Sequence, residues 1–239
     1  MKIDILSLFP EMFLGFLETS IIKRTIDKGL VEVNVHNFRD FSLNKHQKVD
    51  DYPYGGGQGM VLTCQPILDC LKSLTTPEST IILMSPQGVP FCQELASNFS
   101  LSKHLIILCG HYEGFDERIR DYVDVEISIG DYVLTGGELG SMVVSDAIIR
   151  LLDGAIKEDS HIDDSFSNGL LECPQYTRPF EYDGNVVPDI LISGHHANIQ
   201  QWRHQQSLKK TYLRRPDLLE NYPLTQEDKV FLEKITKKD

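Results

Sequence analysis

Three loops that follow predicted strands hold the residues best suited to chemistry. The loops are rich in glycine and polar side chains, and they span Ser85–Gly88, Gly110–Gly114 and Ser128–Gly137. Ligands of open α/β sheets bind beyond the carboxyl ends of the strands, so these loops predict one shared site. Glycines let a ligand approach the backbone, and Ile129, Tyr132 and Leu134 suit a flat apolar group such as adenine. Taken alone, the glycines of the third loop are explained more simply by tight turns.

Charged residues near these loops have ordinary explanations as well as chemical ones. Glu113 and Arg118 suit a loop that leads into a helix, and Arg150 near the end of an apolar helix suits the helix dipole. The acidic pairs Asp50–Asp51 and Asp163–Asp164 lie in predicted loops, where carboxylates are usually solvated. Residue type alone therefore gives none of these side chains a catalytic role.

Several common motifs are absent. The segment Gly55–Met60 fails the GxGxxG dinucleotide pattern because Met60 replaces the last glycine, and it follows a loop rather than a strand. No GxxxxGK[ST] phosphate loop occurs, which disfavours P-loop nucleotide hydrolysis. His195, His196 and His204 have no carboxylate at ligand spacing, so solvated or RNA-facing histidines are favoured over metal ligands. We assign no metal-binding residues.

Cysteine usage and hydropathy indicate the cellular compartment. The 5 cysteines are widely spaced and include no CxxC, which favours buried thiols in a reducing cytosol over disulfides or zinc. The longest apolar stretches, such as Leu105–Cys109, are far shorter than the roughly 20 residues of a transmembrane helix. Asp4 and Glu11 interrupt the apolar N-terminal region, which argues against a signal peptide. We expect a cytoplasmic protein with no membrane partner.

The elements that position the three loops alternate between strand and helix. Strands are predicted over residues 2–9, 31–37, 80–84, 104–109 and 123–129. Helices are predicted over residues 20–28, with Ser20 as its cap, 65–74, 91–98 and 141–152, and residues 38–60 are predicted to be loop. Strand, loop and helix in repetition indicate an α/β domain with a mostly parallel sheet.

The pattern changes after Asp153. Residues 153–169 are polar and acidic without periodicity, which is typical of a linker or mobile loop. Residues 173–188 are extended, and helices are predicted over 197–215 and from Thr225 onward. A domain boundary is therefore expected near residues 160–170.

The net charge of −12 over 239 residues conceals an uneven distribution. Residues 104–189 contain 18 acidic and 5 basic residues, whereas residues 190–215 contain 5 basic residues and no acidic one. Trp202 lies within this basic segment. An acidic chain would ordinarily argue against a nucleic-acid partner, but a local basic helix beside an aromatic residue is a plausible phosphate-binding face.

In combination, eight segments resemble one known family. In order they are VDDYPYGGGQGM, MSPQG, LCGHYEGFDER, SIGDYVLTGGE, DDSF, CPQYTRP, SGHH and LRRPDLL. The chain resembles the bacterial tRNA (guanine-N1)-methyltransferase family, the TrmD type, from Lys2 to about Asp228. At one position the resemblance is imperfect, because His111 stands where many members carry arginine.

The resemblance implies a SPOUT-class fold: an α/β domain with a mostly parallel sheet and a deep trefoil knot, plus a small helical C-terminal domain, in a homodimer. General topology rules count against knots, so the knot follows only from the family. The implied domains are a knotted S-adenosylmethionine-binding domain over residues 1–160, a mobile linker over 161–170 and a tRNA-binding domain over 171–239. The linker is expected to order over the site when tRNA binds.

The resemblance also implies the reaction and its residues. S-adenosylmethionine would donate a methyl group to N1 of the guanine immediately 3′ of the anticodon, position 37, in tRNA. The implied cofactor-binding residues are Met84, Ser85, Pro86, Gly110, Tyr112, Ser128, Ile129, Gly130, Asp131, Tyr132, Val133, Leu134, Gly136 and Gly137. Asp164 would be the general base and Arg150 would stabilise the charge that develops on O6. Glu113 would orient either the guanine or the methionine end of the cofactor.

Contacts with tRNA are expected from two groups of residues in this sequence. They are Lys45, His46, Gly57 and Gly59 in the N-terminal part, and Ser165, Arg203, Lys209, Arg214 and Arg215 in the C-terminal part. The family leaves a requirement for Mg²⁺ open. The alternatives are another SPOUT-class RNA methyltransferase, including one that modifies a ribose hydroxyl, and a tRNA-binding protein without catalysis.

Overall fold

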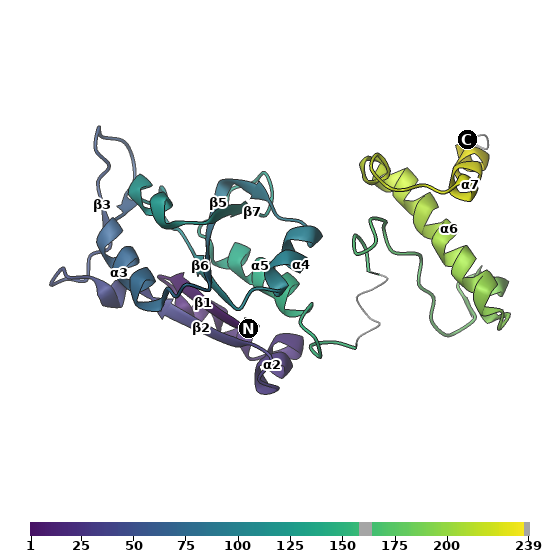
Figure 1. The fold of residues 1–239 in the computed structure, drawn as a ribbon, viewed down its shortest axis with the longest axis horizontal. Helices are drawn as coiled ribbons and strands as arrows, with labels where there is room; N and C mark the ends of the chain where they lie inside the picture. Colours follow the sequence, from purple (N-terminus) through teal and green to yellow (C-terminus); the bar gives the residue numbers. More distant parts are fainter. Residues whose placement is uncertain (158–163, 237–239) are drawn as a thin grey trace. The chain divides into compact units, whose positions relative to one another are not determined.

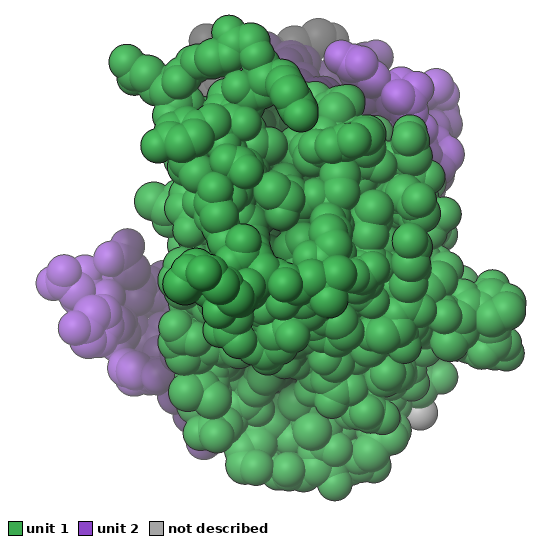
Figure 2. Space-filling view, turned by 90° about the vertical axis from the view of Figure 1, so that its left-hand side faces the viewer, with its two compact units in different colours: residues 1–158 green, residues 159–239 purple. Residues whose placement is uncertain are grey.

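The computed structural model describes residues 1–157 and 164–236 of the chain. The chain divides into two compact units, Met1–Glu158 and Asp159–Asp239, which Figure 2 distinguishes by colour. Unit 1 holds the sheet predicted from the sequence. The functions predicted for the two parts of the chain remain predictions at this stage.

Unit 1 is built on a parallel five-stranded sheet in the order β2-β1-β6-β5-β7 (Figure 1). The strands are β1 (Lys2–Ser7), β2 (Glu32–Asn37), β5 (Ser79–Pro90), β6 (His104–Leu108) and β7 (Val125–Ser128). Every pair of neighbouring strands in this sheet is parallel. The predicted α/β class with a mostly parallel sheet is therefore confirmed.

Helices cover both faces of this sheet. On one face, α2 (Ser20–Asp27), α4 (Gln93–Ser100) and α5 (Glu138–Ile149) pack in a core that includes Leu105 and Ile107 of β6. On the other face, α3 (Cys64–Leu74) and the short helices η2 (Phe38–Phe41) and η3 (Glu117–Tyr122) pack against Ile106 and Leu108. Since both faces are buried, a central strand such as β6 is apolar at successive positions rather than at alternate ones.

Shorter elements complete unit 1. They are η1 (Pro10–Phe13), α1 (Leu14–Leu17) and an antiparallel pair formed by β3 (Asp50–Asp51) and β4 (Val61–Leu62). The prediction of loop throughout residues 38–60 is therefore wrong at η2 and β3. The Asn37 side chain caps η2 by accepting a hydrogen bond from the Arg39 backbone N–H at 3.0 Å.

Two further local predictions need correction. The predicted turn Ser85–Gly88 lies inside β5, where Met84 and Val89 both pair with Ile127 and the residues between them bulge outward. The bulge forms because the residues on both sides of it remain paired with β7. Ser20 does not cap α2: the N-cap is Thr19, and Ser20 has a left-handed φ of 54°.

Unit 2 is mainly helical. Its elements are β8 (Glu181–Tyr182), β9 (Asn185–Val186), η5 (Asp189–Ile192), α6 (His196–Arg214), η6 (Pro216–Leu219) and α7 (Gln226–Thr236). His204 on α6 lies 2.8 Å from the Asp228 carboxylate on α7. The contact between His204 and Asp228 was not predicted from the sequence, because 24 residues separate the two positions. Every helix among residues 1–157 and 164–236 is too short or too polar to span a bilayer.

The segment that begins at Asp164 forms part of unit 2. Residues 161–163 of the predicted linker lie outside the described residues, and from Asp164 onward the chain makes turns. The Phe166 N–H donates to the Leu170 carbonyl at 2.7 Å, and the Leu171 N–H donates to Thr211 Oγ1 at 2.9 Å. The second bond ties the segment to α6.

Candidate functional site

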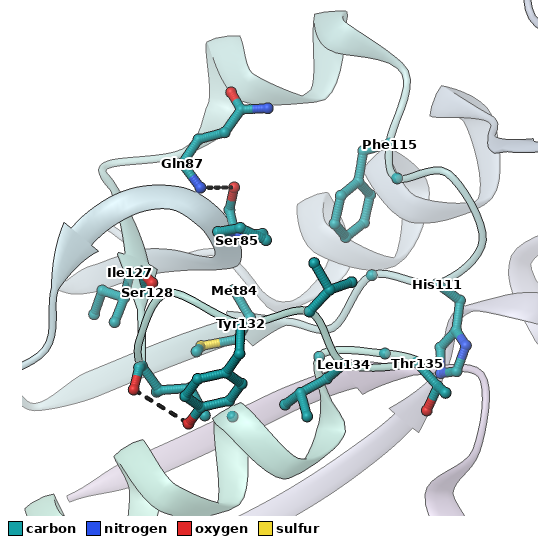
Figure 3. A pocket seen from close by; sticks show the side chains of 18 of the residues that line it. Met84, Ser85, Gln87, His111, Phe115, Ile127, Ser128, Tyr132, Leu134 and Thr135 are labelled. Carbon is teal, nitrogen blue, oxygen red and sulfur yellow. Dashed lines mark hydrogen bonds between the residues drawn. The ribbon is translucent and has the colours of Figure 1, made fainter.

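The three predicted loops meet in one pocket of about 360 Å³, at the bulge of β5 and at the carboxyl ends of β6 and β7. This volume falls within the range of about 300–1,000 Å³ that is usual for small-molecule sites. Figure 3 shows Met84, Tyr132 and Leu134 grouped on one side of the pocket and His111 beside Thr135 at the other. The pocket therefore combines an apolar wall with glycine-rich loops, in which a ligand can approach the backbone.

The structure brings together nearly all of the predicted cofactor-binding residues. The pocket is lined by Met84, Ser85, Pro86, Gly110, Tyr112, Ser128, Ile129, Gly130, Tyr132, Val133, Leu134, Gly136 and Gly137. Asp131 belongs to the same loop but is not among the lining residues. Their roles in binding a cofactor remain predictions.

Other lining residues were not predicted. They are Gln87, His111, Gly114, Phe115, Arg120, Ile127, Thr135 and Gly140. Gln87, His111, Gly114 and Thr135 lie inside the predicted loops, so their position in the sequence was a sufficient signal. Arg120 and Gly140 come from elements that follow the loops, and only packing brings them to the pocket.

Gly137 packs closely against the second loop and joins it to the third. The Gly137 N–H donates to the Gly110 carbonyl at 2.9 Å. A Cβ at Gly137 would lie 2.8 Å from Cys109 Cα, a distance that a real side chain does not tolerate. A glycine is therefore required here for the third loop to reach the second.

Glu113 lines the pocket next to one of the residues predicted to bind tRNA. Its backbone N–H donates to the Met60 carbonyl at 3.0 Å, and Gly59 packs tightly against its side chain. Gly59 has a left-handed φ of 82°, and Gly57 lies two residues before it. The glycine-rich segment before β4 thus runs beside the pocket.

The other two predicted catalytic residues lie on different units. Arg150 is the half-buried C-cap residue of α5 in unit 1, and it is not among the residues that line the pocket. A cation at this end of a helix interacts favourably with the helix dipole, as its position in the sequence suggested. Asp164 belongs to unit 2. The catalytic roles of both residues remain predictions.

Ionisation and burial limit the chemistry of other groups in unit 1. Two hydrogen bonds from the Arg118 guanidinium hold the pKa of the Asp116 carboxyl well below its usual range, so Arg118 is committed to a structural pair. Burial raises the pKa of the Cys109 thiol far above its usual value, and it raises the pKa of Cys70 to about 12. These two thiols are therefore not nucleophiles at neutral pH.

Most of the residues predicted to contact tRNA are exposed. Lys45 and His46 lie in the loop between η2 and β3, and Arg203, Lys209 and Arg214 project from α6. Arg215 is also exposed, but its guanidinium is paired with Asp217 at 2.7 Å. Ser165 Oγ accepts a hydrogen bond from the Glu172 N–H at 3.0 Å. α6 therefore presents the basic surface that the charge distribution predicted.

Metal-ligating side chains do not cluster in the part of the chain that the structure describes. Across residues 1–157 and 164–236, no group of three or more His, Cys, Asp or Glu side chains could hold a metal ion. We therefore assign none of these residues to Mg²⁺.

Comparison with known proteins identifies the family. A sequence model described as "tRNA (Guanine-1)-methyltransferase TrmD" matches residues 1–221. The chain belongs to this family. A tRNA (guanine-N(1)-)-methyltransferase from Staphylococcus carnosus is 60% identical over 99% of this chain and 98% of its own length. Proteins of the same name from Macrococcus caseolyticus and Staphylococcus epidermidis are each 59% identical, and each is covered over 98% of its own length.

Proposed function

We propose that this chain transfers a methyl group from S-adenosylmethionine to N1 of guanine 37, immediately 3′ of the anticodon, in tRNA. Membership of the tRNA (guanine-1)-methyltransferase family supports the reaction class, since the family model spans residues 1–221. The observation that carries the proposal is the convergence of the three predicted loops on one pocket. We place the reaction in the cytoplasm, where tRNA is available.

The pocket suits the adenosine part of the methyl donor. Backbone groups of Gly110 and of residues 129–134 would hold the adenine by hydrogen bonds, and Met84 and Tyr112 would contact it through apolar surface. When bound, S-adenosylmethionine supplies an electrophilic methyl group on a sulfonium. Loops held by rigid strands favour the in-line approach that methyl transfer requires.

The residues of the chain provide proton transfer and charge stabilisation. Guanine N1 carries a proton at neutral pH and is a poor nucleophile, so the Asp164 carboxylate takes that proton. The Arg150 guanidinium stabilises the negative charge that builds on O6, because its planar donors match a base edge. The N1 electron pair then forms the bond to the methyl carbon, while the electron pair of the broken S–CH₃ bond stays on sulfur. Glu113 orients the guanine or the methionine end of the donor.

Replacement of Asp164 tests the assignment of the base. Asp164→Ala is expected to lower kcat by about 10²–10⁴-fold, the usual contribution of a general base, with little change in affinity for S-adenosylmethionine. Single-turnover methylation and calorimetric titration with the donor measure the two effects. Asp189→Ala removes an exposed carboxylate of unit 2 and serves as the control. If Asp164→Ala keeps most of its kcat, another group is the base.

Nucleoside analysis of methylated tRNA tests the reaction itself. Digestion followed by mass spectrometry should yield N1-methylguanosine at position 37. A ribose 2′-O-methyl product would assign the chain to another SPOUT-class activity. Binding of tRNA without any methyl transfer would favour a non-catalytic binding protein.

The proposal includes the family's knot and homodimer. Close contact of Gly137 with Cys109 supports a crossing of the third loop over the second, as a deep trefoil knot requires. Leu139 and Val143, one turn apart on α5, are each 50% exposed although the helix also packs in the core. An apolar face of this kind suits a second copy of the chain.

A further inference from the structure

A buried carboxylate links the pocket to the sheet. The Glu138 side chain is 1% exposed, and its Oε1 accepts a hydrogen bond from Ser7 Oγ at 2.6 Å. Its Oε2 lies 2.8 Å from His111 Nε2. Glu138 is also the first residue of α5, where the positive end of the helix dipole favours a carboxylate. A buried charge is stable only when it is paired and hydrogen-bonded, so both partners are needed.

His111 lies where the second and third loops touch. Its backbone forms an isolated bridge with Gly136, and the neighbouring Gly137 N–H donates to the Gly110 carbonyl. A Cβ at Gly136 would overlap both the His111 ring and the Glu138 carboxylate. The imidazole therefore fills the space that this glycine leaves.

Aromatic packing fixes the same ring from another side. The Phe9 ring meets the His111 ring edge-on, with centroids 4.7 Å apart. The next residue, Tyr112, has a left-handed φ of 58° and lines the pocket. Any shift of His111 would therefore move the residue that faces the ligand.

We propose that His111 is a positioning residue for the methyl donor, which acts through Glu138 to hold loop Gly110–Gly114 against residues 135–137. It shapes the wall that receives the nucleoside part of the donor and takes no part in proton transfer. The inference rests on the proposed function of this pocket. The hydrogen bond from Nε2 to a carboxylate fixed at a helix terminus sets the ring orientation, and the ring sets the distance between the loops.

Donor binding and kinetics separate this role from a purely structural one. His111→Ala is expected to weaken calorimetric binding of S-adenosylmethionine by about tenfold or more, since it leaves a buried carboxylate short of one partner. KM for the donor should rise in parallel, while kcat at saturating donor and KM for tRNA stay nearly unchanged. His111→Gln offers an N–H to the same carboxylate and should recover most of the affinity.

His36→Ala is the matched control. It removes another histidine–carboxylate contact of unit 1, 2.9 Å from His36 Nε2 to Asp4 Oδ1, at a position that does not line the pocket. Donor affinity of this variant should equal that of the unmodified protein. A loss as large as that of His111→Ala would overturn the proposal, because it would show a general effect on folding.

A double-mutant cycle tests whether His111 acts through Glu138. His111→Ala should cost less donor affinity in a Glu138→Gln background than in the unmodified protein. Equal losses in both backgrounds, or unchanged affinity in His111→Ala, would overturn the proposal. If thermal melting shows that His111→Ala does not fold, Glu138→Gln alone decides, and unchanged donor affinity there overturns it. Failure of the unmodified protein to bind the donor would instead contradict the proposed function.

Discussion

Asp4 illustrates at the scale of one residue how a buried charge can stabilise a sheet. Its side chain is fully buried on β1, and it lies 2.8 Å from Lys2 Nζ and 2.8 Å from His104 Nε2. Burial alone would raise its pKa, but hydrogen bonds from Lys2, His36 and His104 outweigh burial and lower the pKa to about 2. The folded protein thus favours the charged form of Asp4 more than the unfolded chain does.

The pKa of Asp4 predicts a loss of stability in acid. Because the folded-state pKa of about 2 is below the ordinary value of 3.8, the contribution is complete above about pH 4 and is lost as the pH falls toward 2. Such a shift corresponds to roughly 2 kcal/mol of unfolding free energy. Urea unfolding between pH 2 and pH 6 should show that the unfolding free energy of Asp4→Asn falls less steeply with decreasing pH than that of the unmodified protein. Equal pH dependence in the two proteins would contradict the assignment.

Gly137 yields a second prediction at this scale. Gly137→Ala should destabilise the protein by about 1–3 kcal/mol and weaken donor binding, since its Cβ would press on the backbone of Cys109. Thermal melting and calorimetry measure the two effects. Gly15→Ala is the control, because a Cβ there meets nothing within 4 Å. If both variants behave alike, close packing at Gly137 is not what the pocket requires.

At the scale of elements, α6 carries a net positive charge although the whole chain carries a net charge of −12. It carries Arg203, Lys209, Lys210 and Arg214 without any acidic residue, beside Trp202. Exposed cations on one helix bind phosphates and release counterions, which makes affinity depend on salt. α6 is therefore the element from which we expect the salt sensitivity of tRNA binding.

Neutralising two of these cations should weaken tRNA binding and flatten its salt dependence. For Arg203→Ala with Lys209→Ala, the slope of log K against log salt should fall by about one for each phosphate that the variant no longer neutralises. Filter binding at several salt concentrations measures this slope. Lys229→Ala removes an exposed cation from α7 and should have a smaller effect. An unchanged slope in the double variant would place the RNA-binding surface elsewhere.

At the scale of the whole molecule, the proposed homodimer depends on the exposed side of α5. Val143→Glu places a charge on a face that is apolar in the single chain, so light scattering should detect monomers. A dimer that survives this change would place the interface on another surface.

In a dimer whose site combines two chains, mixing Arg150→Ala and Asp164→Ala variants should restore part of the activity. The absence of any restoration would favour a site formed within one chain.

Much of the α/β unit follows from local pattern. Apolar runs such as residues 105–109, bounded by loops, indicated buried parallel strands because helices cover both faces of such a sheet. The bulge within β5 was not predicted, because the pairing of both Met84 and Val89 with Ile127 depends on a strand that lies further along the chain. Ser20 was mistaken for a cap because residue type ranks serine above threonine at this position, although its neighbour Thr19 is the N-cap in the structure.

The sequence by itself determined the family, the three loops of the pocket and the basic helix, since these depend on residue order and local periodicity. Only the tertiary structure decided which side chains meet across long separations. The hydrogen bond between Ser7 and Glu138 joins residues 131 positions apart, and the contact between His204 and Asp228 joins two helices. The physical reason is that a buried carboxylate selects its partners by distance and desolvation in the folded chain, and no local pattern records that choice.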